Sequence, residues 1–220
     1  MSTRERIDQK GRTRQDLLQA AARLMKTGVV PTLADVATEA RVSRATAYRY
    51  YSNEKALLQD AVLDSAAPIP EQLFAGDASR DPIERLLKAD AALRKVVWEN
   101  QNQFRLMLAR VLEEAAKANG VPAEPLRQNR RTGLIEAALS PVRDQFDDAV
   151  YRKLCAALAL VFGTESMVVF RDVLQMDDPE AAEVEGWAVE VLARAALAES
   201  ERSRNQAKAG AGKPKKSHHK

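Results

Sequence analysis

Arginine, hydroxyl and tyrosine side chains are concentrated in the run SRATAYRYY, which begins at Ser43 and ends at Tyr51. Arginine can donate two parallel hydrogen bonds to a guanine, and hydroxyl groups can donate to phosphate oxygens. A helix over this run would place small, basic and aromatic residues on one arc: Arg44, Ala45, Tyr48 and Arg49. Ala47 and Tyr51 would lie on the opposite arc, with Thr46 and Tyr50 at the margins. The spacing therefore predicts a helix that packs on one side and can touch the major groove of DNA with the other.

A second helix, just before this run, would hold it in place. Thr32 suits an N-cap, and Asp35 three residues later completes a capping box. Apolar residues follow at helical spacing: Leu33, Val36, Ala37 and Ala40. Ser43 is another good N-cap, so residues 32–51 indicate two short helices joined by a tight turn. This pattern is typical of a helix-turn-helix, although the turn lacks the common glycine, and an exposed turn of an ordinary helical bundle is the alternative interpretation.

The flanking segments also have helical patterns. From Gln15 onward an apolar stripe is formed by Leu17, Leu18, Ala21, Leu24 and Met25. After Tyr51, either Ser52 or Asn53 can cap a further helix that packs through Leu57, Leu58, Ala61 and Val62. The sequence thus predicts a helix before the two short ones and a helix after them.

With these neighbours on either side, residues 11–62 resemble the N-terminal domain of TetR-type (tetracycline-repressor-like) transcriptional regulators. The block TLADVATEARVSRATAYRYYSNEKALL, preceded by an amphipathic helix, carries the resemblance, which covers about the first quarter of the chain. It implies DNA contacts through Thr32, Arg44, Ala45, Thr46, Tyr48, Tyr50 and Lys55, and Arg49 joins this set from the exposed arc. Leu33 and Ala34 are apolar where some relatives have a polar or basic base-reading residue.

The resemblance also implies an architecture and a mode of action. It implies an all-α protein of about nine helices that binds a near-palindromic operator as a homodimer through its last two helices. It further implies a repressor that a small-molecule inducer releases from DNA. In that scheme the linker helix, from Asn53 to Asp64, shifts when the inducer enters the body of the protein.

Charge is unevenly distributed along the 220 residues. Residues 1–60 contain 11 Lys and Arg against 7 Asp and Glu, residues 201–220 contain 7 against 1, and the remainder contains 16 against 23. Basic ends and an acidic body fit a protein that touches polyanions through its ends. We expect a flexible basic arm at residues 1–12, a helix-turn-helix domain with its linker helix at 13–64, a helical regulatory and dimerisation domain at 65–199, and a disordered basic tail at 200–220.

The body is predicted to be helical because no stretch alternates like a β-strand. Helices are expected at 83–97, 101–118, 122–139, 149–176 and 179–198. The segment from Ala149 to Met176 is apolar nearly all round, and a helix of that kind must be covered on both sides. A second subunit could provide the cover, and the dimer-interface candidates are Val161, Glu165, Val168, Asp172, Trp187 and Val191.

A small-molecule pocket could be lined by apolar side chains of the body, each of which could equally be ordinary core: Trp98, Phe104, Met107, Met167 and Phe170. Glu165 lies among apolar neighbours and needs a partner. We favour an arginine of the facing subunit, such as Arg194, over a cationic group of the ligand. The inducer is therefore expected to be largely apolar, and a positive charge on it is left open.

Other functional classes find less support. The two histidines, His218 and His219, lie in the basic tail, and the chain has no glycine-rich phosphate loop, nucleophile elbow or metal-ligand cluster. We therefore expect neither an enzyme nor a cofactor or metal site. The single cysteine excludes an intrachain disulfide, and the polar N-terminus lacks the apolar core of a signal peptide, so a cytoplasmic protein is expected. The alternatives are a constitutive or sequence-blind nucleoid DNA-binding protein and, with less support, a helical enzyme.

Overall fold

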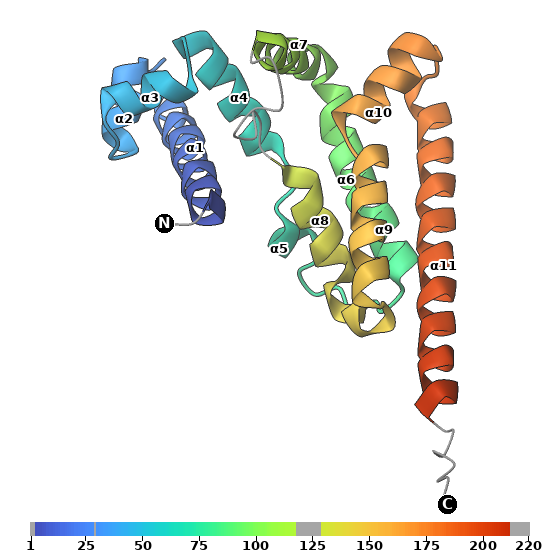
Figure 1. Cartoon of the computed structure of the whole chain (residues 1–220). Coiled ribbons are helices and arrows are strands. Elements are labelled where there is room, and N and C mark those ends of the chain that lie inside the picture. Colours follow the sequence, from blue (N-terminus) through green and yellow to red (C-terminus); the bar gives the residue numbers. More distant parts are fainter. Residues whose placement is uncertain (1–2, 29, 118–128, 212–220) are drawn as a thin grey trace, which may run out of the picture. The chain divides into compact units, whose positions relative to one another are not determined.

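The structure is a computed structural model that describes residues 3–28, 30–117 and 129–211 (Figure 1). Across these ranges it contains no β-strand, and nine of its α-helices have seven or more residues. The predicted all-α fold with about nine helices is confirmed. The chain forms two compact units: the described residues of Met1–Ala67 and Val96–Arg130, and those of Pro68–Lys95 and Arg131–Lys220. The first division falls near the expected boundary at residue 64, but residues 96–130 cluster with the N-terminal unit and not with the rest of the body.

The N-terminal unit is built from α1 (Thr3–Lys26), α2 (Leu33–Glu39), α3 (Arg44–Tyr50), α4 (Glu54–Ala66), the end of α6 (Pro82–Glu99) and α7 (Gln101–Lys117). The expected apolar stripes meet in one core that includes Leu17, Leu18, Leu33, Val36, Ala47, Tyr51 and Leu57. Each large apolar side chain buried there contributes roughly 1.5 to 3 kcal/mol. Within the unit α1 packs against α4 and α2, and α2 packs against α3.

The flexible arm expected at residues 1–12 is wrong for its described part, because α1 already begins at Thr3. Arginine, glutamate, glutamine and lysine all favour a helix without forming an apolar stripe. The apolar periodicity that starts near Gln15 therefore marks where the helix becomes packed, and not where it begins. Residues 1 and 2 lie outside the described residues.

The C-terminal unit contains α5 (Pro70–Leu73), most of α6, α8 (Arg130–Leu139) from its second residue, the 3₁₀-helix η1 (Ser140–Gln145), α9 (Asp148–Val161), α10 (Thr164–Val168), the π-helix η2 (Val169–Val173) and α11 (Asp178–Ala211). Helices α9 and α11 pack along each other. One stripe of α11 is buried: Ala181, Glu185, Val189, Ala193, Ala196 and Ser200. Gly186 also lies close to α6, since a Cβ atom there would be 3.6 Å from Leu87 Cδ2.

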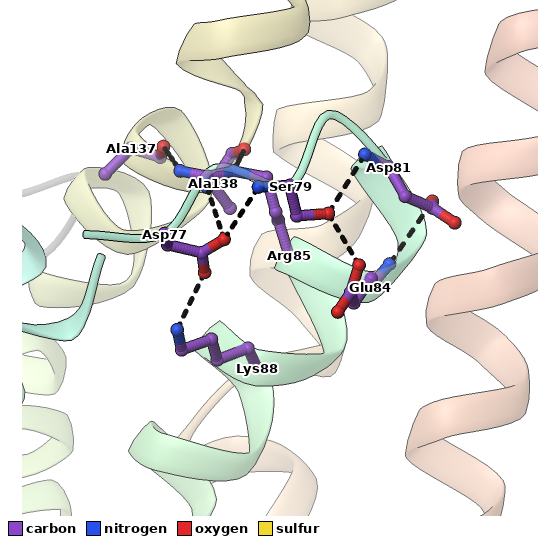
Figure 2. A network of polar contacts seen from close by, with 8 residues as sticks. All are labelled: Asp77, Ser79, Asp81, Glu84, Arg85, Lys88, Ala137 and Ala138. Atoms are coloured by element: carbon purple, nitrogen blue, oxygen red, sulfur yellow. Dashed lines mark hydrogen bonds and ion pairs between the residues drawn. The ribbon is translucent and has the colours of Figure 1, made fainter. Parts of the chain in front are cut away.

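Arg85 ties three elements of this unit together (Figure 2). Its Nε donates to the Ala138 carbonyl at 2.7 Å and its Nη2 to the Ala137 carbonyl at 3.1 Å, so it satisfies open carbonyls at the end of α8. Its Nη1 lies 3.4 Å from Asp77, which also accepts from Lys88 Nζ at 2.7 Å. The network fixes the loop before α6 and has a structural role.

The single apolar helix expected at 149–176 is wrong. Helix α9 ends at Val161, Phe162 is extended, and Gly163 has φ 109° and ψ −148°, a conformation that only glycine adopts without strain. The chain then forms α10 and η2. The expected cover on both sides is also not provided by the described chain, because Leu160, Val169, Val173 and Leu174 are exposed.

The segment Asp148–Val173 is long and apolar enough to cross a membrane by length and composition, and 33% of the window is buried. Its first helix, α9, has 14 residues and spans about 21 Å, short of the roughly 30 Å of a bilayer core. An interruption at Phe162 and Gly163 would leave backbone groups unpaired in lipid. The segment is therefore weak evidence for a membrane span.

The disordered tail expected at 200–220 is also wrong for its described part, because α11 continues to Ala211. Ser200 is fully buried, and its hydroxyl accepts from the Asp147 backbone N–H at 3.1 Å. Arg204 Nη2 donates to the Gln145 carbonyl at 3.2 Å. The spacing of apolar residues cannot predict polar contacts of this kind. The remaining tail, with His218 and His219, lies outside the described residues.

Candidate nucleic-acid interface

Three acceptors satisfy the first turn of α2. Thr32 Oγ1 accepts from the Asp35 N–H at 3.2 Å, and Asp35 Oδ2 accepts from the Thr32 N–H at 2.9 Å, so the predicted capping box is confirmed. The hydrogen bonds from Thr32 hold the pKa of Asp35 below its usual value. Glu54, at the start of α4, accepts from the Leu33 N–H at 3.2 Å. Helix α4 therefore fixes where α2 begins, a contact that spans 21 residues and was not predicted.

The turn between α2 and α3 contains a strained residue. Arg41 has φ 56°, in the left-handed region that favours glycine. The turn is closed by the Val42 N–H, which donates to the Ala37 carbonyl at 2.9 Å. The absence of glycine from this turn thus has a structural counterpart, since an arginine occupies the position where glycine would relieve strain. Arg41 is exposed, so its guanidinium is free to face solvent or a polyanion.

Helix α3 has the two faces that its sequence predicts. Ser43 Oγ accepts from the Thr46 N–H at 3.0 Å, which confirms the expected N-cap. Ala47 and Tyr51 are fully buried. The opposite arc is exposed, and it consists of Arg44, Ala45, Tyr48 and Arg49. Tyr48 has 56% of its surface exposed, which is unusual for a tyrosine in a packed helical unit.

The hydroxyl groups of the predicted interface differ in availability. Thr46 Oγ1 is bonded to Ser43 Oγ at 2.8 Å, and the Thr32 hydroxyl donates to Asp35 Oδ2 at 2.7 Å. Both of these side chains therefore already make capping interactions. The phosphate contact expected of Tyr50 is wrong, because its hydroxyl is buried inside the N-terminal unit and finds no hydrogen-bond partner among the described residues. The Tyr50 ring instead packs against the core and lies 5.4 Å from the Arg49 guanidinium.

Behind α3, a buried polar chain links four helices. Arg14 of α1 donates through Nε to Tyr51 Oη at 3.2 Å, and through Nη2 to Asp60 Oδ2 at 3.2 Å. The other carboxylate oxygen of Asp60 accepts from Arg110 of α7 at 2.6 Å. Burial raises the pKa of Tyr51, so its hydroxyl stays protonated. One turn further along α4, Asp64 accepts from Gln15 at 3.3 Å and from Arg130 Nε at 2.9 Å.

Sequence reasoning missed this buried chain. The contacts of Asp60 and Asp64 join residues 46 to 66 positions apart. In a sequence, a charged residue within a helical pattern indicates the face of the helix that water contacts. The only local signal is the pair of aspartates four residues apart on an otherwise apolar helix face.

Three of the basic residues predicted to contact DNA are exposed. Arg44, Arg49 and Lys55 are exposed and form no ion pair with the described part of the chain. Lys55 lies in the first turn of α4, two residues after Asn53, whose side chain accepts from the Ala56 N–H at 2.9 Å. The cap confirms Asn53, and not Ser52, as the start of this helix. Arg44 and Arg49 make the exposed arc of α3 basic, and Tyr48 is its aromatic member.

The five predicted pocket residues divide between the two units. Trp98, Phe104 and Met107 belong to the N-terminal unit and are partly buried, whereas Met167 and Phe170 belong to the other unit. Met167 is only 1% exposed and is ordinary core. Trp98 is different, because its Nε1–H is buried without an acceptor in the described part of the chain. A hollow of about 890 Å³ opens between α1 and α2, but its rim is polar and includes the Arg23–Glu39 ion pair, so it does not suit an apolar ligand.

Glu165 has a partner within its own subunit, Arg131, which was not among the expected partners. Its Oε2 accepts from Arg131 Nη2 at 2.7 Å, and Arg131 Nη1 donates to the Ala159 carbonyl at 2.7 Å. Arg194, the partner expected from a facing subunit, pairs with Glu190 one turn away on α11. Arg131 therefore holds the break between α9 and α10, with its guanidinium beside Gly163.

The predicted dimer residues divide by exposure. Trp187 is 65% exposed, and Val191 and Asp172 are also exposed, whereas Val161, Glu165 and Val168 are half-buried. Further exposed apolar side chains lie on the same unit: Leu160, Val169, Val173, Leu174 and Val184. On α11 the exposed residues Val184, Trp187 and Val191 follow a helical spacing of three and four, so they share one stripe. This unit carries an extended apolar surface.

Two carboxyl groups are buried in the C-terminal unit. Glu185 is 2% exposed, its Oε2 lies 3.6 Å from Arg94 Nε, and Arg94 also pairs with Asp178. Burial raises the pKa of Glu185 to about 8, and the neighbouring Asp90 adds to the shift while Ser166 and Arg94 oppose it. Burial likewise raises the pKa of Asp90 to about 6 against the effect of Arg94. One arginine is thus shared by three acidic residues.

Comparisons of the chain with protein-family models, with curated proteins and with solved structures found no match.

Proposed function

We propose that this chain is a DNA-binding transcriptional regulator of the TetR type, in which α3 enters the major groove of an operator. One observation carries the proposal: α3 is a capped helix with Ala47 and Tyr51 buried, and with Arg44, Tyr48 and Arg49 exposed on the other face. A monomeric helical unit has no structural need for that basic and aromatic face, whereas a groove-reading helix does.

The residues divide into two roles. Arg44 and Ala45, in the first turn of α3, are suited to base edges, because the N-terminal end of a recognition helix lies deepest in the groove. Tyr48, Arg49 and Lys55 are suited to phosphates. Thr32 caps α2, and the Thr46 hydroxyl is hydrogen-bonded to Ser43, the N-cap of α3. A phosphate could be reached only by the part of each hydroxyl that these bonds leave open. Arg41 is a further phosphate candidate from the turn.

The partner of the extended apolar surface is a second copy of the chain in this proposal. A homodimer formed through the α9 and α11 face would cover Trp187, Val191 and Leu160, which water now contacts. It would also present two recognition helices to one face of the duplex, so the operator would be near-palindromic. Repression and a cytoplasmic location complete the proposal.

The regulatory ligand is proposed to be a largely apolar small molecule. With Glu165 paired to Arg131, no carboxylate of α10 is left to select a cation. Trp98 supports a neutral ligand with a hydrogen-bond acceptor, because its buried indole N–H lacks one. Phe104 and Met107, on α7 of the same unit, supply apolar contact in this proposal.

Selection from random-sequence DNA by the purified full-length protein at fixed salt tests the function. We expect enrichment of a near-palindromic site, bound roughly 10³-fold or more tightly than random DNA. Enrichment of no sequence, with tight binding to all DNA, would instead show a sequence-blind nucleoid protein. Absence of DNA binding at low salt would refute both.

A further inference from the structure

The buried chain of polar contacts in the N-terminal unit joins the recognition helix to α7. Tyr51 is the C-cap residue of α3: its backbone N–H donates to the Ala47 carbonyl, and its side chain is buried in the core of the unit. Arg14 bonds its hydroxyl, Asp60 bonds Arg14, and Arg110 of α7 bonds Asp60. We propose that Asp60 is a positioning residue that transmits the placement of α7 to the recognition helix.

Asp60 is suited to this role by its two separate oxygens. One oxygen accepts from Arg14 and the other from Arg110, and the carboxylate is about nine-tenths buried. In a medium that excludes water, such charge-assisted hydrogen bonds are strong and directional. If α7 moves, Asp60 must either follow Arg110 or leave the partly buried Arg110 guanidinium without this partner. Either outcome changes what Arg14, and through it Tyr51, is bonded to.

A second connection runs parallel to the first. Asp64, one turn further along α4, accepts from Gln15 and from Arg130, and Arg130 Nη2 also donates to Gln15 Oε1 at 3.0 Å. Helix α4 therefore presents two carboxylates, four residues apart, to α1 on one side and to residues after position 100 on the other. This double attachment explains why residues 96–130 cluster with the N-terminal unit.

The inference rests on the proposed function for its consequence, because α7 also bears Phe104 and Met107, the proposed ligand contacts. A ligand that displaces α7 would alter the pairing of Asp60 and so the angle of α3. The coupling itself is a property of the free protein and can be measured without DNA.

Amide hydrogen exchange of the full-length protein, in a double-mutant cycle, tests the coupling. The variants are Arg110→Met, Tyr51→Phe and the two combined, with Lys117→Met as the control, since Lys117 forms an exposed ion pair with Glu113 on the same helix. We expect Arg110→Met to accelerate exchange of the α3 amides by roughly 5- to 150-fold while α11 amides are unchanged. In the Tyr51→Phe background, where the link is already cut, Arg110→Met should add less than about 2-fold. The control should leave α3 unchanged.

Equal acceleration of exchange in α3 and α11 would overturn the proposal, because it would show a loss of stability throughout the protein. Additive effects of the two substitutions would also overturn it, because they would show that Arg110 and Tyr51 act independently. If Arg110→Met does not fold, Arg110→Lys keeps the charge with fewer donors, and the same α3-specific, non-additive response is then required of it. Affinity for a DNA fragment selected by the unaltered protein should fall in parallel with α3 protection. If the unaltered protein selects no fragment, the proposed function fails, while the exchange data still decide the coupling.

Discussion

Glu185 couples the stability of the C-terminal unit to pH. Its pKa is raised to about 8 in the folded chain, so the folded state holds a proton that the unfolded state has lost above about pH 4.5. The stability that this group contributes is fully present below the pKa of Glu185 in the unfolded chain. It is lost as the pH rises towards the pKa of Glu185 in the folded chain. Asp90 acts in the same direction over a lower window, which ends near pH 6. The unit should therefore be most stable in mild acid.

The first prediction follows from this sign. Glu185→Gln imitates the protonated acid at every pH, so it should change the unfolding free energy little at pH 5 and raise it by on the order of 3 kcal/mol at pH 8.5. Urea unfolding of the full-length protein, followed at both pH values, measures the effect. Glu183→Gln, an exposed neighbour on α11, is the matched control and should leave the pH dependence unchanged. An equally steep decline with pH in Glu185→Gln would remove this residue from the explanation.

The second prediction separates base reading from phosphate binding. Arg44→Ala should weaken binding to the selected site by about 1 to 3 kcal/mol and relax preference at one base pair. Lys55→Ala should weaken all sequences alike and reduce the slope of log affinity against log salt by about 1. Fluorescence anisotropy titrations at several salt concentrations distinguish the two. Unchanged affinity and preference in Arg44→Ala would mean that α3 is not inserted in this orientation.

At the level of elements, the break at Gly163 is the feature most sensitive to a single methyl group. A Cβ atom there would meet Arg131 at 3.5 Å, an ordinary contact, so the cost comes from the backbone and not from space. The third prediction is that Gly163→Ala destabilises the C-terminal unit by about 1 to 3 kcal/mol. Gly133→Ala is the control with the opposite sign, because Gly133 lies within α8 with open space around it and alanine favours a helix by about 1 kcal/mol. Chemical unfolding of both variants measures the difference, and equal destabilisation would contradict the argument.

The elements that sequence analysis found are those fixed by local rules. The caps at Thr32 and Ser43, the burial of Ala47 and Tyr51 and the all-helical body depend on neighbours within about four residues. Periodicity and capping chemistry describe such neighbours directly. The same rules predicted that the helix continues through Gly163, because the backbone conformation of a single glycine in an apolar run cannot be inferred from its neighbours.

Contacts between distant segments were beyond the reach of those rules. Asp60 and Arg110, or Arg131 and Glu165, are ordinary charged residues of amphipathic helices until folding brings them together. The same limit explains the error over Tyr50, whose marginal position on the helical wheel left the direction of its hydroxyl open. The polar first turns of α1 were missed for a different reason, because their residues favour a helix without forming an apolar stripe. Whether the exposed arc of α3 binds DNA stays a prediction.

At the scale of the whole molecule, the extended apolar surface of the C-terminal unit favours binding to a partner. An exposed tryptophan lies between two exposed valines on one stripe of α11, and the α9 to η2 segment of the same unit exposes a leucine and two further valines. Exposed apolar residues gathered in this way are typical of an interaction surface. The proposed function leads to the same expectation. If α3, with its seven residues, enters the major groove as proposed, one copy would read few base pairs, and two copies separated by about 34 to 36 Å would read a site on one face of the duplex.

The last prediction joins assembly to DNA binding. Trp187→Glu places a charge in the centre of the proposed interface. Burying that charge without a partner would cost more free energy than the remaining contacts of the interface contribute. Sedimentation at micromolar concentration should therefore show a monomer for this variant and a dimer for the unaltered chain. Its affinity for the selected palindrome should fall to that for an isolated half-site, while its far-ultraviolet circular dichroism is unchanged. Leu106→Glu is the matched control, since Leu106 is similarly exposed but lies on α7 of the other unit, and it should remain dimeric. A monomeric unaltered protein, or a Trp187→Glu protein that still dimerises, would show that the α11 surface is not the interface and that the operator need not be symmetric.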